Sequence, residues 1–327
     1  MRGRDLIGAG ALWSASQSSH PQPARKIYRI GILTVAPTAA AAGPRPKSRS
    51  IGACLRGMRD LGYVYGEHFV TEARGADDEP ERFPALAAEL IHFDLDVIVG
   101  AGPSLRALQR ATATTPIVMA SSGDPVGEGL VRSLAHPGGN FTGMSAQTVE
   151  TVGKRLEFLK EFLPDAAPVA VLWHHDYVRT WQAAQAAARV RGWKLVSIEI
   201  RDADEIDASF KAATAARASA LLVHAPAVLQ SHRQRVAKLA IRHRLPTMFH
   251  HRTYVDAGGL MAHGADSVEI WHRAAAFVSK ILNGAKPADL PVEQPTKFEL
   301  VINLKTAKAL GITIPPLLLL RGNEVIQ

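Results

Sequence analysis

The chain has 327 residues, of which 47% are apolar and 21% are charged, a composition typical of a globular protein. This length favours two folded lobes over one small core. Residues 1–50 hold eight Lys or Arg and a single Asp, so they carry +7 of the net charge of +8 and leave the remainder nearly neutral. A nearly neutral body argues against a broad nucleic-acid-binding surface, which needs basic residues spread along one face.

The first 25 residues resemble a secretion signal followed by a linker. Arg2 and Arg4 form a basic start, residues 6–13 a short apolar core, and residues 14–16 are the small residues that a signal peptidase accepts. A polar segment with two prolines continues to residue 25. We therefore expect export to the periplasm; the alternative is a leader without an export role on a cytoplasmic protein.

Short apolar runs alternate with amphipathic stretches over residues 26–145. Apolar or alternating runs predict strands, and a 3.6-residue period predicts helices. The expected strands are 28–33, 69–73, 97–100, 117–120 and 141–143, and the expected helices are 51–61, 81–93, 103–112 and 126–134.

The same pattern starts again after a break at residues 143–148. The expected strands are 169–173, 194–200, 220–223, 247–249 and 260–262, the expected helices are 149–163, 178–191, 204–217, 228–243 and 266–282, and residues 300–327 add a strand, a helix and an irregular end. Strands that alternate with helices in this way predict parallel βαβ units. The predicted fold class is α/β, with two Rossmann-like, doubly wound lobes and a ligand in the crevice between them.

Five segments of the sequence resemble a known family. They are GMRDLGYVYG (57–66), GDPVG (123–127), HPGGNFTG (136–143), GKRLE (153–157) and KFELVINLKTAKALG (297–311). Together, and in this order, they are similar to segments of the ABC-transporter periplasmic substrate-binding proteins, in a branch with the type I periplasmic-binding fold.

The resemblance implies two lobes joined by a hinge of several crossing segments. Lobe 1 is expected to comprise residues 26–145 and 258–290, and lobe 2 residues 146–257 and 291–327. It further implies a monomer without cofactor or enzymatic activity, which closes on a small-molecule solute and delivers it to an ABC permease at the inner membrane. Amino acids, aromatic acids and amides are the solute classes that the family suggests.

In the family, solute contacts come from the loops that follow the strands. Carried over position by position, the expected contacts in the first lobe are Gly102, Pro103, Ser104, Ser121, Ser122, Gly123 and Asp124, with Ser145 near the crossing. Two roles stay open for Ser104 and Asp124, since either side chain can contact the solute or cap the helix that follows. For Asp124 the cap is favoured, and Ser121 and Ser122 are the preferred contacts.

Histidines are concentrated at or just after the predicted strand ends of the second lobe. They are His174, His175, His224, His250, His251 and His263. Three interpretations stay open: binding of an anionic or aromatic solute, ordinary polar loop residues, or ligation of a transition metal, although no tight His spacing supports a metal. We include His174, His175, His224 and His250 in the expected solute site, and we prefer Tyr177 and Tyr254 over Trp173 and Trp181 as stacking partners.

Other classes of function find little support in the sequence. Cys54 is the only cysteine, which excludes an intrachain disulfide and a Cys-ligated zinc site. The chain has no Gly-x-Ser-x-Gly elbow, no phosphate-binding loop and no Gly-x-Gly-x-x-Gly after the first strand. A transcription regulator on this fold needs a helix-turn-helix domain, and no helix pair fits ahead of the first strand. A ligand sensor without a transport role remains an alternative, and a metal-binding or enzymatic protein a more distant one.

Overall fold

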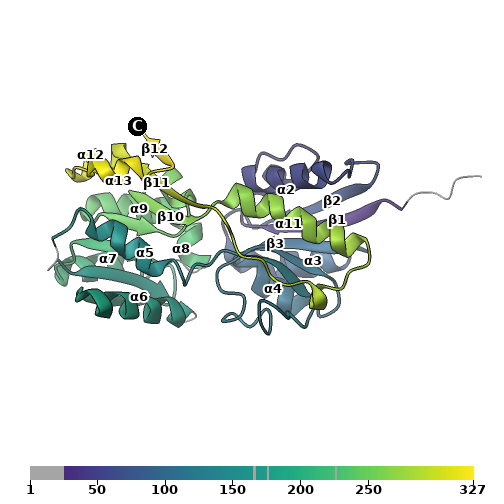
Figure 1. The fold of residues 1–327 in the computed structure, drawn as a ribbon, viewed down its shortest axis with the longest axis horizontal. Helices are drawn as coiled ribbons and strands as arrows, with labels where there is room; N and C mark the ends of the chain where they lie inside the picture. The colour runs from purple at the N-terminus through teal and green to yellow at the C-terminus, as the bar shows by residue number, and fades with distance from the viewer. Residues whose placement is uncertain (1–25, 165–166, 175–176, 225–226) are drawn as a thin grey trace, which may run out of the picture.

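The computed structural model describes residues 26–164, 167–174, 177–224 and 227–327. In this part of the chain, two α/β lobes lie side by side (Figure 1). The structure confirms the predicted fold class. The predicted signal segment and His175 lie outside the described residues.

The first lobe contains a parallel five-stranded sheet with the strand order β2-β1-β3-β4-β5. Its strands are β1 (Tyr28–Thr34), β2 (Phe69–Gly75), β3 (Val97–Ala101), β4 (Ile117–Ser122) and β5 (Phe141–Ser145). Its helices are α1 (Thr38–Ala41), α2 (Arg49–Asp60), η1 (Pro80–Arg82), α3 (Phe83–Ile91), α4 (Ser104–Ala111), α11 (Ser267–Leu282) and η3 (Pro287–Asp289).

Strand β3 explains why both faces of this sheet are covered. Val97 and Val99 pack in the cluster that includes α2 and α11, whereas Ile98 packs in the cluster that includes α3 and α4. Side chains alternate between the faces of a strand, so a continuous apolar run needs a helical layer on each side.

The second lobe contains a seven-stranded sheet with the order β12-β11-β10-β9-β8-β6-β7, parallel except for the β10–β11 pair. Its strands are β6 (Val169–His174), β7 (Leu195–Ile200), β8 (Ala220–Val223), β9 (Thr247–Phe249), β10 (Met261–Ala265), β11 (Phe298–Asn303) and β12 (Glu324–Ile326). Its helices are α5 (Val152–Lys160), α6 (Val178–Arg191), α7 (Ile206–Ala215), α8 (Ala227–Ser231), α9 (Arg233–Arg242), α10 (Thr253–Asp256), α12 (Leu304–Leu310) and α13 (Pro316–Leu320).

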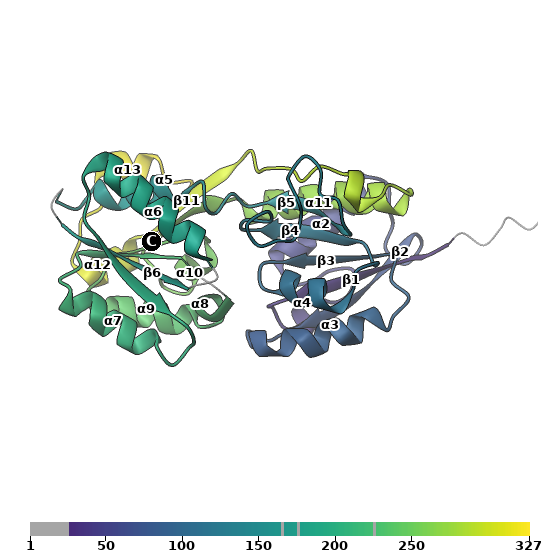
Figure 2. The same ribbon diagram turned by 90° about the horizontal axis from the view of Figure 1, so that it is seen from below.

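The chain passes between the lobes three times within the described residues: after β5, between β10 and α11, and before β11. The first and third passages lie side by side, because the Ser145 N–H donates to the Glu293 carbonyl at 2.8 Å and the Glu293 N–H to the Gly143 carbonyl at 2.9 Å (Figure 2). Such paired connections allow the lobes to rotate about a shared hinge.

One predicted lobe boundary is wrong. Residues 258–290 were expected in lobe 1, but β10 pairs with β9 and β11 in the second sheet, and the chain returns only with α11. The return is secured at Gly57 of α2, where an added Cβ would lie 2.7 Å from the Cβ of Ala275 in α11. The two helices can approach this closely because Gly57 has no side chain.

The predicted helix over residues 126–134 is also wrong. This segment consists of turns, in which Gly129 has a φ of +69° and the Asp124 carboxylate accepts a hydrogen bond from the Gly127 N–H at 2.9 Å. Two glycines following Pro125 favour turns over a continued helix. Asp124 therefore caps a turn and not a helix.

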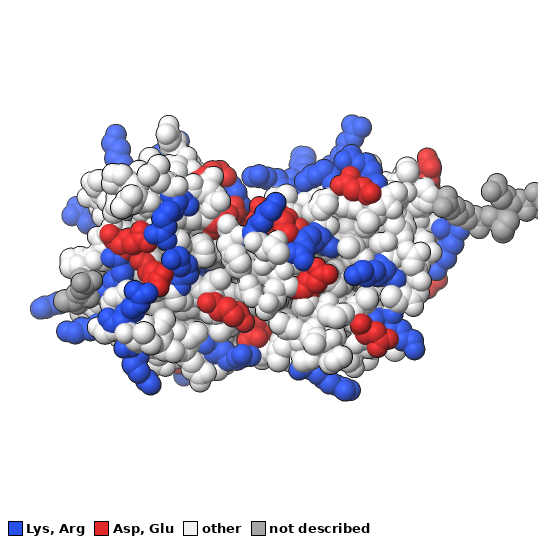
Figure 3. Space-filling model, in the orientation of Figure 1, with Lys and Arg blue, Asp and Glu red and all other residues white. Residues whose placement is uncertain are grey.

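Charged side chains of both signs are interspersed on the face shown in Figure 3. None of the described helices is long and apolar enough to cross a membrane.

Candidate functional site

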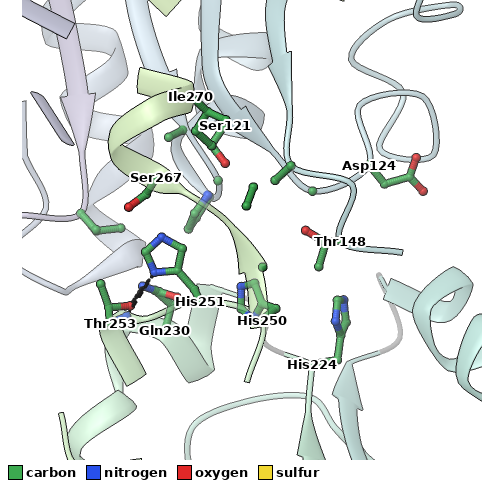
Figure 4. A pocket seen from close by; sticks show the side chains of 18 of the residues that line it. Ser121, Asp124, Thr148, His224, Gln230, His250, His251, Thr253, Ser267 and Ile270 are labelled. Atoms are coloured by element: carbon green, nitrogen blue, oxygen red, sulfur yellow. Dashed lines mark hydrogen bonds between the residues drawn. The ribbon is translucent and has the colours of Figure 1, made fainter. Parts of the chain in front are cut away.

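A cavity of about 520 Å³ lies between the two lobes and is lined by residues from both. This volume falls within the range of 300–1,000 Å³ that is typical of small-molecule sites. The wall formed by lobe 1 is called the first wall below, and the wall formed by lobe 2 the second wall. Figure 4 shows both of them facing the cavity.

The first wall combines hydroxyl groups with apolar surface. Ser121, at the end of β4, and Ser267, at the start of α11, point into the cavity (Figure 4), and their hydroxyls make no hydrogen bond to any described residue. Ile270 and Trp271, one turn further along α11, provide the apolar part of the wall. Parallel strands and helix starts meet at this edge of the sheet, which explains why these polar groups converge.

Glu128 adds a carboxylate to the first wall. It lies in the turns after β4 and accepts a hydrogen bond from the Ser122 hydroxyl at 3.2 Å. Desolvation in the cleft raises the pKa of Glu128 to about 7, although the Ser122 hydrogen bond and Arg106 act in the opposite direction.

The second wall is built from aromatic and imidazole rings. His224 follows β8 and His250 and His251 follow β9, so that the sheet places all three at its carboxyl edge. The ring of Tyr177 lies edge-on to His224 at 5.5 Å, and the His224 and His250 rings are 5.9 Å apart. These rings offer a solute surfaces for stacking as well as single hydrogen bonds.

The hydrogen bonds of His251 determine its tautomer. Its Nδ1 accepts from the Thr253 N–H at 3.3 Å and lies 2.9 Å from the Thr253 hydroxyl, which in turn accepts from Gln230 at 2.9 Å. Desolvation lowers the pKa of His251 to about 4, so the ring is neutral at physiological pH. A neutral ring that accepts at Nδ1 carries its proton on Nε2, and the ring extends from Thr253 toward the cavity (Figure 4).

A buried arginine lies close to the second wall. Arg155 of α5 is 1% exposed and donates to the Thr148 carbonyl, whereas its Nε and Nη1 have no hydrogen-bond partner among the described residues. Desolvation lowers the pKa of Arg155 to about 9. Desolvation, together with the Arg155 charge, holds the pKa values of His224 and His250 well below 6.5, so both imidazoles are neutral.

Two ion pairs join the lobes at the edges of the cavity. Asp78, after β2, pairs with Arg233 of α9 through two hydrogen bonds of 2.7 and 2.9 Å. Asp124 of lobe 1 pairs with Arg179 of α6 at 2.9 Å. Both pairs can form only while the lobes are close together, and they therefore favour the closed arrangement.

The structure brings many of the predicted site residues to the cavity. Gly102, Pro103, Ser121, Gly123, Asp124, Tyr177, His224 and His250 lie on its walls. Solute contact at these positions remains a prediction. The first-lobe loop over residues 36–50, which the sequence shows as poor in polar groups, also reaches the cavity through Ser48 and Ser50.

Three of the predicted serines are held elsewhere. The Ser104 hydroxyl bonds to the backbone of Ala101, and Ser122 is fully buried with its hydroxyl on Glu128. The hydroxyl of Ser145, at the hinge, accepts from the Gln147 N–H at 3.2 Å. None of the three lines the cavity, because each satisfies local backbone or side-chain groups.

Three of the aromatic and histidine candidates also lie away from the cavity. Tyr254 is fully buried and stacks on Phe249 at 4.5 Å. His174 bonds through Nε2 to the Arg201 carbonyl at 3.2 Å. His263 lies within β10 between Phe158 and Phe298, because that strand continues three residues beyond its predicted end.

Several residues on the walls were missed by the sequence analysis. They include Glu128, Thr148, Arg179, Gln230, Ser267 and Trp271. The sequence carries a signal for Glu128, which stands between two glycines directly after β4. It carries none for Ser267 and Trp271, which reach the cavity only because α11 returns to lobe 1. Among the described residues, no group of three or more His, Cys, Asp or Glu side chains is arranged to hold a metal ion.

Two parallel-sheet lobes that enclose a cavity and share a hinge define a two-lobed ligand-binding protein with the periplasmic-binding fold. A family model described as "ABC transporter substrate binding protein" matches residues 47–326, and the chain belongs to this family. The resemblance that the sequence motifs indicated is therefore confirmed.

The chain is similar to proteins whose names or structures indicate a ligand. It is 26% identical over 262 residues to a tyrosine-binding protein of Clostridioides difficile (strain R20291), covering 79% of this chain and 75% of that protein. A conserved domain protein from Vibrio cholerae O1 biovar El Tor is 26% identical, with a TM-score of 0.80, and covers 92% of this chain and 100% of the other. A Streptococcus pneumoniae ABC domain in complex with L-Trp, with 24% identity, a TM-score of 0.80 and the same coverage, shares the fold.

Proposed function

We propose that the protein is the solute-binding component of an ABC importer, which captures a small molecule between its lobes and delivers it to a membrane permease. The observation that carries this proposal is the cavity itself, with polar groups from both lobes directed into it. We further propose that the protein acts as a monomer in the periplasm and needs no cofactor or catalytic step.

The proposed solute is an aromatic amino acid. The tyrosine-binding relative supports this class, and the chemistry of the walls is compatible with it. Trp271, Ile270, Tyr177 and the neutral imidazoles offer an aromatic ring apolar and stacking surface, while Ser121, Ser267 and the His251 N–H offer hydrogen bonds to its polar groups.

Capture follows from differential affinity for two arrangements of the lobes. A solute that contacts both walls binds the closed arrangement more tightly than the open one, and it shifts the equilibrium by that difference. The Asp78–Arg233 and Asp124–Arg179 pairs add to the closed state. The hinge at residues 143–145 and 293 provides the axis.

A thermal-shift screen of amino acids, aromatic carboxylates, amides and divalent metals tests the proposal. We expect L-tyrosine or L-tryptophan to raise the melting temperature, since a ligand at a hundred times its Kd adds about 2.7 kcal/mol of stability. No shift with any amino acid would contradict the proposed solute class. Osmotic-shock fractionation tests the location, with release of the protein as the expected result.

A further inference from the structure

Glu128 differs from the other carboxylates that line the cavity. Asp78 and Asp124 are each paired with an arginine of the opposite lobe, whereas Glu128 forms no ion pair within the described residues. Its only side-chain hydrogen bond in this part of the chain comes from the neutral hydroxyl of Ser122. A carboxylate enclosed in a cleft without a cation is unfavourable, and a cationic partner offsets this cost.

The surroundings of Glu128 leave this cation to be supplied by the solute. Arg106 of α4 acts on Glu128 only through space, and Arg179 is engaged with Asp124. Thr148, at the hinge, borders the same Gly123 backbone as Glu128: a Cβ added to Gly123 would lie 3.3 Å from Thr148 Oγ1 and 3.5 Å from Glu128 Oε1. An ammonium group, which has three donors, matches such a set of neighbouring oxygen acceptors.

We propose that Glu128 receives the protonated amine of the solute, with Thr148 beside it, and thereby restricts the cleft to solutes that carry such an amine. This inference rests on the proposed solute-binding function and names the group that distinguishes an amino acid from the corresponding aromatic acid. A carboxylic acid without the amine leaves Glu128 unpaired, and the like charge also disfavours it.

The binding of an amine at Glu128 is linked to pH. Below its pKa of about 7 the free carboxyl carries a proton, which the ammonium must displace, so the apparent affinity weakens as the pH falls. From pH 8 to pH 6 we expect a loss of about tenfold. The histidines of the second wall do not produce this profile, because the pKa of His251 is about 4 and those of His224 and His250 are also well below 6.5.

The remaining charged groups around Glu128 keep their charge over this range. They are Asp124 on its own loop, Arg106 of α4, Arg179 of α6, and Arg155, whose guanidinium bonds to Thr148 and whose pKa is lowered to about 9. The profile between pH 6 and pH 8 is therefore assigned to Glu128.

Calorimetric titration with three matched ligands tests the proposal. L-Tyrosine carries both amine and carboxylate, tyramine lacks the carboxylate, and 3-(4-hydroxyphenyl)propionate lacks the amine. Each is titrated at pH 6, 7 and 8 into the wild type and Glu128→Gln, which keeps an acceptor for Ser122. The matched control is Glu150→Gln, which removes an exposed carboxylate outside the cavity.

We expect Glu128→Gln to weaken L-tyrosine binding about ten- to a hundredfold and to flatten its pH profile, because a charge-assisted hydrogen bond is lost. Tyramine should also lose affinity in this variant, the amine-free acid should not, and Glu150→Gln should match the wild type. Wild-type affinity of Glu128→Gln for L-tyrosine, or tighter wild-type binding of the amine-free acid, would overturn the role of Glu128 while leaving the aromatic cleft in place.

Two further outcomes separate this inference from the proposed solute class. Binding of a non-aromatic amino acid that depends on Glu128 would support the inference and contradict the aromatic solute. No binding of any of the twenty amino acids by the wild type would contradict both.

Discussion

The two walls of the cavity are built by different means. The first wall presents hydroxyls, one unpaired carboxylate and apolar side chains on loops and on the start of α11. The second wall presents imidazoles, at the ends of neighbouring strands, that burial and Arg155 keep neutral. The difference suggests a division of roles, in which the first wall recognises charge and the second wall provides stacking surface and neutral hydrogen bonds.

The first wall depends on a helix that arrives from far along the chain. We expect Gly57→Leu to separate α11 from α2 and to lower the free energy of unfolding by roughly 1–3 kcal/mol, because overpacking forces the helices apart. Solute affinity should fall as well, since Ser267 and Trp271 are carried on α11. Chemical denaturation measures the first effect.

A matched control lies in the same helix. Gly52 of α2 has nothing closer than 3.4 Å to an added Cβ, and that neighbour is the mobile end of Arg56. Gly52→Ala should therefore leave stability unchanged or raise it by up to about 1 kcal/mol. Equal destabilisation by both substitutions would contradict the close contact at Gly57.

The second wall should make stability depend on pH. The pKa values of His224, His250 and His251 are lower in the folded protein than the usual 6.5, so the unfolded chain binds more protons as the pH falls below 6.5. Stability is then lost between pH 6.5 and the lowered folded values, about 4 for His251, at up to about 1.4 kcal/mol per pH unit for each histidine.

Urea unfolding at pH 7, 6 and 5 measures this slope. His224→Gln removes one contributor and should reduce it. Glu128 acts with the opposite sign, because its raised pKa favours the folded state at low pH and this contribution is lost as the pH rises from 4.5 through 7. A stability that stays constant from pH 7 to pH 5 in the wild type would contradict the neutral imidazole wall.

Ser121 and Ser104 separate exposed from engaged hydroxyls on the first wall. Ser121→Ala should weaken solute binding about three- to tenfold, which corresponds to one hydrogen bond, with little change in stability. Ser104→Ala should lower stability by about 0.5–1.5 kcal/mol, because its hydroxyl bonds to the Ala101 backbone, and affinity should stay within about twofold. Titration calorimetry and thermal unfolding distinguish the two, and the reverse assignment would return Ser104 to the site.

The ion pairs at the cavity edge give the smallest expected effect. Arg233→Met removes the pair with Asp78 between the lobes and should weaken solute affinity about two- to fivefold, less at high salt. Arg235→Met, also on α9, breaks a pair with Asp207 inside lobe 2 and should leave affinity unchanged. Equal effects of the two variants on affinity would argue against a role of the Asp78 pair in closure.

The sequence was sufficient for the fold and for much of the second wall. Periodicity placed the strands, and a residue that follows a parallel strand reaches the carboxyl edge of the sheet, as His224 and His250 do. Spacing could not show that Tyr254 turns inward against Phe249, or that α11 brings Ser267 and Trp271 to the cavity. Those positions depend on packing between segments far apart in the chain, and the pKa values depend on burial that a single sequence does not encode locally.

The central claim is that one solute is held by both walls. Calorimetric titration of L-tyrosine into the wild type, Ser121→Ala and His250→Gln tests it most directly. The account predicts one site per chain and weaker binding in each variant, because each removes a group from a different wall. Wild-type affinity in either variant would contradict a solute held by both walls.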